Sequence, residues 1–101
     1  MEKLTIDEIR ADLREIRYYY SKQKVFDSAA KTVSRSSVMD TVDIYNEVIK
    51  FAPARLYDLY IALYVQNNSQ EALAYDWGFS AEYIRRLNKQ LYGFLLKALT
   101  E

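Results

Sequence analysis

Residues 69–87 read SQEALAYDWGFSAEYIRRL, and their spacing predicts two short helices joined by a tight turn. We expect Ser69 to cap the first helix and Ser80 the second, because a serine hydroxyl accepts a backbone N–H that the first helical turn leaves unpaired. Gly78 falls where the chain must turn sharply, and glycine adopts a left-handed backbone conformation without the cost of a β-carbon. Ala74, one helical turn earlier, leaves room for the two helices to cross.

This spacing is typical of a DNA-binding helix-turn-helix. The apolar residues expected to fix the angle between the two helices are Leu73, Trp77, Phe79, Ile84 and Leu87. The outer face of the second helix then stays free. The residues predicted to contact DNA are Gln70, Ser80, Ala81, Glu82, Arg85, Arg86 and Lys89. The alternative is that two ordinary helices of an all-α domain pack here, with Ala74 and Gly78 serving packing alone.

The composition excludes several kinds of catalytic and metal site. The chain has 101 residues, which is enough for one domain that buries a core without disulfides. It contains no cysteine and no histidine, so thiolate metal sites, thiol nucleophiles and histidine bases are ruled out. The sequence has no glycine-rich phosphate loop and no paired carboxylates on separate elements. We therefore predict no catalytic residue, no metal ligand and no cofactor, and a protein that is not an enzyme.

Charge and hydropathy indicate where the protein acts. No apolar run has the length of a signal peptide or a membrane span, so we expect a cytoplasmic protein with no membrane partner. Fourteen basic and fourteen acidic residues give a net charge of zero, which argues against non-specific coating of nucleic acid. Residues 80–101 hold four basic and two acidic residues, the largest basic excess along the chain. This small excess predicts weak phosphate contacts from one copy, so specific binding would need two copies or a protein partner.

The rest of the chain predicts an all-α fold of about five helices in a single domain, residues 1–101. Two glycines and one proline interrupt the chain, and no long stretch alternates with a period of two. Thr5-Ile-Asp-Glu8 has the pattern of a capping box and predicts the start of a long N-terminal helix that runs to about Phe26. Its apolar stripe comprises Ile6, Ile9, Leu13, Ile16 and Tyr20. Such a narrow stripe packs either on the core of the domain or against a second copy as a helical pair.

Residues 27–37 are small and polar and predict a loop. The helical body is expected over residues 38–99, with helices at about 38–51, 54–65 and 80–99 and the helix-turn-helix at about 69–90. The residues predicted to face inward are Val38, Val42, Tyr45, Ile49, Leu56, Leu59, Tyr60, Leu63, Tyr64, Ile84, Leu87, Leu91, Leu95 and Ala98. The second half of the last helix is apolar on more than one side and must pack against another element, for which the N-terminal stripe is available. Self-association through the last helix or through the N-terminal stripe would also bury this apolar surface, so we expect a homodimer.

Two further patterns admit a functional and a structural interpretation. Ten tyrosines are present, and Tyr18, Tyr19 and Tyr20 lie beside basic residues, as in proteins that stack on single-stranded nucleic acid. The interpretation we favour is that tyrosines at helical spacing are half-buried core residues whose hydroxyls reach the surface. Likewise, the acidic row Asp40, Asp43 and Glu47 is interpreted as a solvated face or a docking patch for a basic partner rather than as a cation site.

The order of these parts resembles the small phage regulators related to sigma factor region 4. The likeness is sharpest in Leu59-Tyr-Ile-Ala-Leu-Tyr64, Ala72-Leu-Ala-Tyr-Asp-Trp-Gly-Phe-Ser80 and Tyr83-Ile-Arg-Arg-Leu87. ArpU-type late transcription regulators and short streptococcal phage proteins share this layout. The resemblance implies a protein encoded by a phage or mobile element that binds promoter DNA through the helix beginning at Ser80, with RNA polymerase as a partner.

Two functions therefore stay open at the level of the sequence. In the favoured one, a sequence-specific regulator of transcription binds double-stranded DNA. Arg85, Arg86 and Lys89 reach bases or phosphates, while Gln70 and Ser80 anchor the DNA backbone through their helix N-termini. In the alternative, a phage protein docks on a host protein and modulates it, and the same two helices serve as a scaffold.

Overall fold

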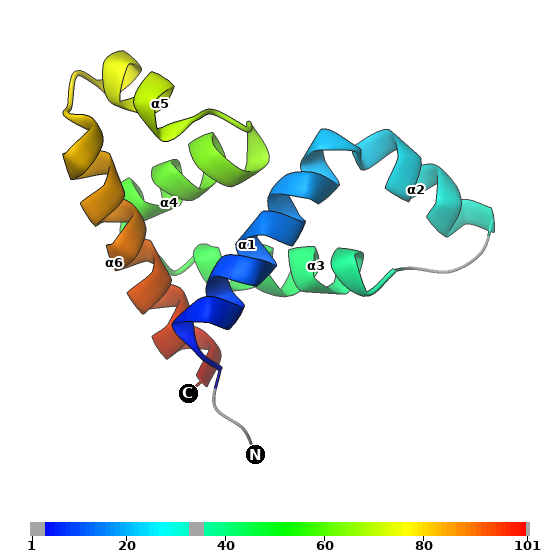
Figure 1. Cartoon of the computed structure of the whole chain (residues 1–101). Coiled ribbons are helices and arrows are strands. Elements are labelled where there is room, and N and C mark those ends of the chain that lie inside the picture. Colours follow the sequence, from blue (N-terminus) through cyan, green and yellow to red (C-terminus); the bar gives the residue numbers. More distant parts are fainter. Residues whose placement is uncertain (1–3, 33–35, 101) are drawn as a thin grey trace.

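The computed structural model describes residues 4–32 and 36–100, and over this part of the chain the protein is built from helices alone (Figure 1). The helices are α1 (Ile6–Ser21), α2 (Gln23–Thr32), α3 (Ser37–Ile49), α4 (Ala54–Tyr60), the π-helical segment η1 (Ile61–Val65), α5 (Gln70–Trp77) and α6 (Ala81–Thr100). The predicted all-α class is confirmed. The predicted count of about five helices is too low, since the described residues form six α-helices.

The additional helix arises because the predicted N-terminal helix does not run unbroken to Phe26. The capping box at Thr5 and Glu8 is confirmed, with both of its hydrogen bonds present. However, α1 ends at Ser21, where the Lys22 N–H reaches the carbonyls of Tyr18 and Tyr19 and the backbone bends. The bend brings the Phe26 ring to 5.4 Å from the Tyr19 ring, measured between centroids.

A second contact stabilises this bend and explains why the predicted loop at residues 27–37 is largely wrong. The Tyr19 hydroxyl donates to Asp27 Oδ1 at 2.9 Å, which holds the first half of α2 against the end of α1. The helix then continues to Thr32 and projects away from the other helices (Figure 1). Residues 33–35 of the predicted loop lie outside the described residues. Ser36 caps α3 by accepting the Met39 N–H on its hydroxyl.

The helix predicted over residues 54–65 changes its winding partway. It is α-helical from Ala54 to Tyr60 and π-helical from Ile61 to Val65, so that the Gln66 N–H bonds to the Ile61 carbonyl five residues back at 2.8 Å. The backbone and side-chain N–H groups of Asn68 both donate to the carbonyl of Ala62, each at 3.0 Å. The chain therefore leaves η1 through a fixed turn into α5.

The core forms where α1 crosses α6, with α3, α4 and η1 packed around them (Figure 1). The predicted partner of the apolar C-terminal helix is confirmed, because α1 packs on α6 and the side chains of Ile9, Ile16, Leu91 and Leu95 are fully buried. The two ends of the stripe are less buried than predicted. Ile6 is 38% exposed, and Tyr20 is half-buried against the core, while its neighbour Tyr19 is buried.

The inward faces of the other helices agree closely with the sequence pattern. The predicted residues that are buried are Val42, Tyr45, Ile49, Leu56, Leu59, Tyr60, Leu63, Tyr64, Ile84, Leu87, Leu91 and Leu95. Val38 and Ala98 are half-buried, and Met39 takes a core position beside Val38 that the sequence analysis did not assign. No helix among the described residues is long and apolar enough to span a lipid bilayer.

The tyrosines agree only in part with the half-buried positions predicted for them. Tyr45, Tyr60 and Tyr64 are buried more deeply than predicted, with exposed fractions of at most 7%, whereas the half-buried tyrosines include Tyr20, Tyr83 and Tyr92. The Tyr45 hydroxyl donates to Asp12 Oδ2 at 2.7 Å and the Tyr60 hydroxyl to Asn46 Oδ1 at 3.1 Å. Burial, as the main cause, raises the pKa of both phenols above its ordinary value, because the charged form loses its hydration. Tyr18, in contrast, is exposed.

Candidate nucleic-acid interface

The turn between α5 and α6 has the local geometry that the sequence predicts. The Ser69 hydroxyl accepts the Ala72 N–H at 3.0 Å, and the Ser80 hydroxyl accepts the Tyr83 N–H at 3.1 Å. Gly78 has φ 74°, in the left-handed region. The N–H of the following residue, Phe79, then donates to the Ala74 carbonyl at 2.9 Å and closes the end of α5. The caps and the glycine turn are therefore confirmed.

The packing between α5 and α6 also follows the predicted pattern, with one exception. Leu73 and Ala74 of α5 and Ile84 and Leu87 of α6 are buried, and the two helices are in contact. Trp77 is half-buried and packs against the core, as predicted, whereas Phe79 is 37% exposed. The structure fixes this tight helical pair, whereas its assignment as a helix-turn-helix that binds DNA stays a prediction.

Phe79 instead belongs to an aromatic cluster on the surface of the turn. Its ring lies 4.7 Å from the ring of Tyr83, measured between centroids. The Arg55 guanidinium of α4 lies 5.0 Å from the Phe79 ring and 5.8 Å from the Trp77 ring. A cation over an aromatic face is attracted by the quadrupole of the ring, so Arg55 connects α4 to the α5–α6 turn. Arg55 could not be predicted from the sequence, because its partners lie more than twenty positions away.

The residues predicted to contact DNA differ in their exposure. Glu82, Arg85, Arg86 and Lys89 are exposed along α6, as predicted. Arg86 lies over the Tyr83 ring at 5.8 Å. Ser80 is exposed at the start of α6 with its hydroxyl used in the cap. Ala81 and Gln70 are half-buried.

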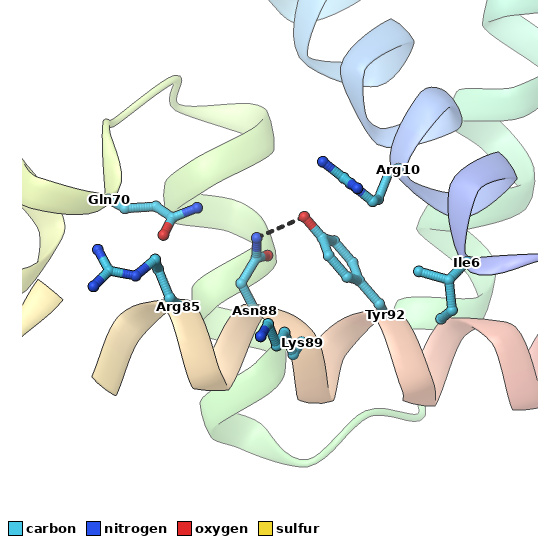
Figure 2. A pocket seen from close by; sticks show the side chains of 7 residues that line it. All are labelled: Ile6, Arg10, Gln70, Arg85, Asn88, Lys89 and Tyr92. Carbon is cyan, nitrogen blue, oxygen red and sulfur yellow. Dashed lines mark hydrogen bonds between the residues drawn. The ribbon is translucent and has the colours of Figure 1, made fainter. Parts of the chain in front are cut away.

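Three of the predicted residues share one open groove between α1, α5 and α6 (Figure 2). The groove has a volume of about 490 Å³ and is lined by Ile6, Arg10, Gln70, Arg85, Asn88, Lys89 and Tyr92. Gln70, Arg85 and Lys89 are thus brought together, while Ser80, Ala81, Glu82 and Arg86 lie outside its lining. Three of the lining residues are cations, and none is a carboxylate.

The cations of this groove have few partners among the described residues. The one ion pair that involves the groove joins Arg10 to Asp7 at 4.0 Å, between two exposed side chains. A pair of this kind contributes little, because water screens both charges. Within the described part of the chain, Arg85 and Lys89 have neither an ion pair nor a hydrogen bond. The groove therefore offers positive charge that a ligand can use.

A buried amide forms the floor of the groove. Asn88 is 4% exposed and is held between two tyrosines. The Tyr64 hydroxyl donates to Asn88 Oδ1 at 2.7 Å, and Asn88 Nδ2 donates to the Tyr92 hydroxyl oxygen at 2.8 Å (Figure 2 shows the second bond). Burial, followed by the neighbouring Tyr92, raises the pKa of Tyr64, so its hydroxyl stays protonated and continues to donate.

Four residues of the groove were not predicted from the sequence: Ile6, Arg10, Asn88 and Tyr92. A signal for Asn88 was present, since it is a polar residue at a helical position between the buried Leu87 and Leu91. No such signal exists for Arg10, because its place beside α6 depends on how α1 crosses that helix.

No three Asp, Glu, Cys or His side chains in the described ranges are grouped as metal ligands would be. The row Asp40, Asp43 and Glu47 is exposed on α3, and Glu47 pairs there with Lys50, with 2.9 Å between Oε1 and Nζ.

A comparison of the chain with protein-family models, curated proteins and solved structures gives no match. The interpretation of the groove therefore depends on its geometry and charge.

Proposed function

We propose that this protein is a sequence-specific DNA-binding regulator of transcription that presents α6 to double-stranded DNA. In this proposal Arg85 reads bases, Arg86 and Lys89 contact bases or phosphates, and Gln70 and Ser80 position the DNA backbone at the starts of α5 and α6. Ala81 and Glu82 occupy the first turn of α6, next to the DNA. The protein acts in the cytoplasm, where its DNA ligand lies.

One observation carries the proposal: the cations of α6 stand on a helix whose opposite side is locked into the core. Ile84, Leu87, Leu91 and Leu95 are buried, with exposed fractions of at most 4%, whereas Arg85, Arg86 and Lys89 are exposed. A helix fixed in this way presents its side chains in a defined geometry, which reading base edges requires. The tight α5–α6 turn at Gly78 supports the same proposal, because this is how a helix-turn-helix orients its second helix.

The zero net charge of the chain shapes the rest of the proposal. One neutral copy gains little affinity from phosphate contacts alone, so we propose that two copies, or one copy with RNA polymerase, occupy a site. The resemblance to phage regulators related to sigma factor region 4 supports RNA polymerase as that partner. Light scattering of the protein with and without its target duplex measures whether two copies assemble. A monomer at tens of micromolar, both free and bound, would leave polymerase as the partner.

The decisive experiment is selection of bound duplexes from a random library, performed with and without RNA polymerase. The proposal predicts enrichment of a common sequence in at least one of the two selections. It also predicts that the affinity for that sequence falls as salt rises, because released counterions drive the phosphate contacts. If neither selection enriches a sequence, the proposal is wrong.

Two substitutions test the roles assigned on α6. Arg85→Ala should abolish discrimination between target and random duplexes, since a base contact contributes about 1 to 3 kcal/mol. Lys89→Ala should weaken binding to every sequence and flatten the salt dependence, as loss of a phosphate contact does. Lys97→Ala is the matched control, because Lys97 is an exposed cation in the last turn of the same helix. If the first two variants bind as Lys97→Ala does, α6 does not read DNA.

A second candidate function, docking on a host protein, is favoured by a different surface. An apolar groove between α3 and α6 is lined by Val48, Phe51, Phe94 and Ala98 together with Glu47, and the Phe51 side chain is 83% exposed. Phe94 follows Arg85 by about two and a half turns of α6, so it points to the opposite side of that helix. Absence of duplex binding combined with retention of a host protein by the parent, and loss of that retention in Phe51→Ser, would establish this second function.

A further inference from the structure

We infer that the groove between α1, α5 and α6 binds a phosphate group of the nucleic-acid backbone, with Arg10 and Tyr92 as donors. Both residues lie outside the set assigned to DNA by the sequence. The inference rests on the proposed function for the molecule that carries the phosphate. It goes beyond that function by assigning the groove a ligand and by giving α1 a part in binding.

The direction of the hydrogen bonds on the groove floor shows what Tyr92 can do. The Tyr64 hydroxyl gives its proton to Asn88 Oδ1, and Asn88 Nδ2 gives a proton to the Tyr92 oxygen. The Tyr92 oxygen therefore acts as an acceptor from below, and its own proton is left to donate. Among the described residues, the neighbouring Tyr64 hydroxyl lies within hydrogen-bonding reach of Tyr92, and a charged phosphate oxygen is a stronger acceptor than that neutral hydroxyl. Since Tyr92 is a half-buried side chain that lines the groove, the O–H group is available to a ligand there.

The remaining polar groups of the groove are also mostly donors. Arg10, Arg85 and Lys89 carry only N–H donors, and Asn88 Nδ2 has a second proton beside the one given to Tyr92. The acceptors in the lining are the Gln70 amide oxygen and two oxygens that already accept a hydrogen bond, Asn88 Oδ1 and the Tyr92 hydroxyl oxygen. In Figure 2 the side chains of Gln70 and Arg10 lie on opposite sides of the hydrogen bond between Asn88 and Tyr92. A ligand that enters between them meets donors from three helices.

Charge and shape select a phosphate as that ligand. Three cations without a lining carboxylate repel one another in the free protein, and a negatively charged ligand relieves that repulsion. A phosphate diester has oxygens that only accept hydrogen bonds and carries one charge, which matches a surface of donors. The groove is open rather than closed, so a backbone can pass through it while one phosphate sits against Arg10 and Tyr92.

Binding of duplexes by three variants tests the inference. Arg10→Gln should lower the affinity for every duplex about fivefold to tenfold and reduce the slope of the salt dependence by about one. Tyr92→Phe should lower the affinity about fivefold without changing that slope, since it removes one neutral donor. Arg14→Gln is the control, because Arg14 is an exposed cation one turn along α1 that does not line the groove. Melting curves of each variant establish that the fold is intact.

A second measurement separates the groove from the proposed function. The side-chain N–H signals of Arg10 and Arg85 are followed by NMR during titration with inorganic phosphate, in the parent and in Tyr92→Phe. We expect saturable shifts in the parent that are weaker in Tyr92→Phe, with the Arg14 signal unmoved.

Each result has a distinct meaning. If duplexes bind and depend on Arg85, but Arg10→Gln and Tyr92→Phe bind as Arg14→Gln does, the inference is overturned and the proposed function stands. If no duplex binds but phosphate moves the groove signals, the oxyanion site is supported, and both the backbone assignment and the proposed function are overturned. If phosphate moves the Arg14 signal as much as that of Arg10, the groove is not a site.

Discussion

The turns before and after α5 each hold one residue in the left-handed region, but they stabilise that conformation in different ways. Asn67, before α5, has φ 62°, and Gly78, after it, has φ 74°, so both occupy the left-handed region. Gly78 adopts this conformation without a side chain, and no atom outside the neighbouring residues lies within 4 Å of the place where a Cβ would be. Asn67 is held by a distant residue, because Arg17 Nε of α1 donates to its Oδ1 at 2.9 Å. The guanidinium also donates to the carbonyls of Asn67 at 3.3 Å and Asn68 at 3.4 Å.

This difference separates two properties of the α5–α6 pair. The glycine turn is local and fixes the angle between α5 and α6. The asparagine turn is tied to α1, so it fixes where the pair lies relative to the rest of the core. The groove has α1 on one side and the α5–α6 pair on the other. Its width therefore depends on the asparagine turn more than on the glycine turn. Four substitutions or conditions test this division, beginning with the largest expected effect.

Loss of Arg17 should cost the most. Arg17→Met keeps the aliphatic part of the side chain but removes three hydrogen bonds from a cation to one turn, and we expect a loss of about 2 kcal/mol in the free energy of unfolding. Urea unfolding followed by circular dichroism measures it. Arg14→Met, which removes an exposed cation from the same helix, should change stability by less than about 0.5 kcal/mol. Equal effects in the two variants would mean that Arg17 does not hold the turn.

Gly78→Val should destabilise the protein by more than about 1 kcal/mol, because a β-branched residue is strained at positive φ. An added Cβ would meet no atom within 4 Å outside the neighbouring residues, so we attribute this cost to the backbone conformation. Gly93→Ala is the matched control: Gly93 lies inside α6 with open space around it, and alanine there should stabilise by about 0.5 to 1 kcal/mol. An unchanged midpoint in thermal melting of Gly78→Val would show that the turn tolerates a side chain.

Alkaline pH should weaken the segment before Asn67, because Tyr64 lies in it. The pKa of Tyr64 is raised in the folded protein, whereas an unfolded tyrosine titrates near 10. Below pH 10 both states keep the proton and the contribution of Tyr64 is complete. Above it the unfolded state loses its proton first, so stability falls as pH rises, by about 1 kcal/mol near pH 11. Tyr64→Phe should start from a lower stability and fall less steeply between pH 9 and 11 in urea titrations; parallel curves would contradict this.

The smallest effect is expected for Asn67→Gly. Glycine relieves the left-handed conformation but removes the Oδ1 acceptor of Arg17, so these two changes offset each other and the net loss should be about 0.5 kcal/mol. Asn67→Ala keeps the strain and loses the acceptor, and should cost about 1 kcal/mol more. If the two variants are equally stable by urea unfolding, backbone strain at position 67 does not contribute.

The features of the fold that could be predicted from the sequence are those set by neighbouring residues. The caps at Thr5, Ser69 and Ser80 and the left-handed Gly78 each depend on chemistry within one helical turn, and all four are confirmed. The inward faces of α3 to α6 followed from spacing for the same reason. The break at Lys22 could not be predicted in this way, because it depends on Phe26 and Asp27 packing back on Tyr19.

The candidate site was predicted only as far as it lies on α5 and α6. Gln70, Arg85 and Lys89 share the groove because helical periodicity places them there. Arg10 completes the groove from a helix sixty or more residues earlier, and only the crossing of α1 over α6 brings it there. Asn88 would have been found if a polar residue on an apolar face had been treated as a signal, since such a residue needs buried partners. It has two, Tyr64 and Tyr92.

The π-helical segment η1 affects the direction in which α5 and α6 face. A π-turn accommodates one residue more than an α-helical turn does, as a single inserted residue would. An extra residue rotates everything that follows by about 100° around the helix axis, without altering any downstream side chain. The direction in which Asn67, α5 and the cations of α6 face is therefore set by counting within Ile61–Val65. The number of residues in η1 therefore determines the direction of the α6 cations, although they lie more than twenty residues further along the chain.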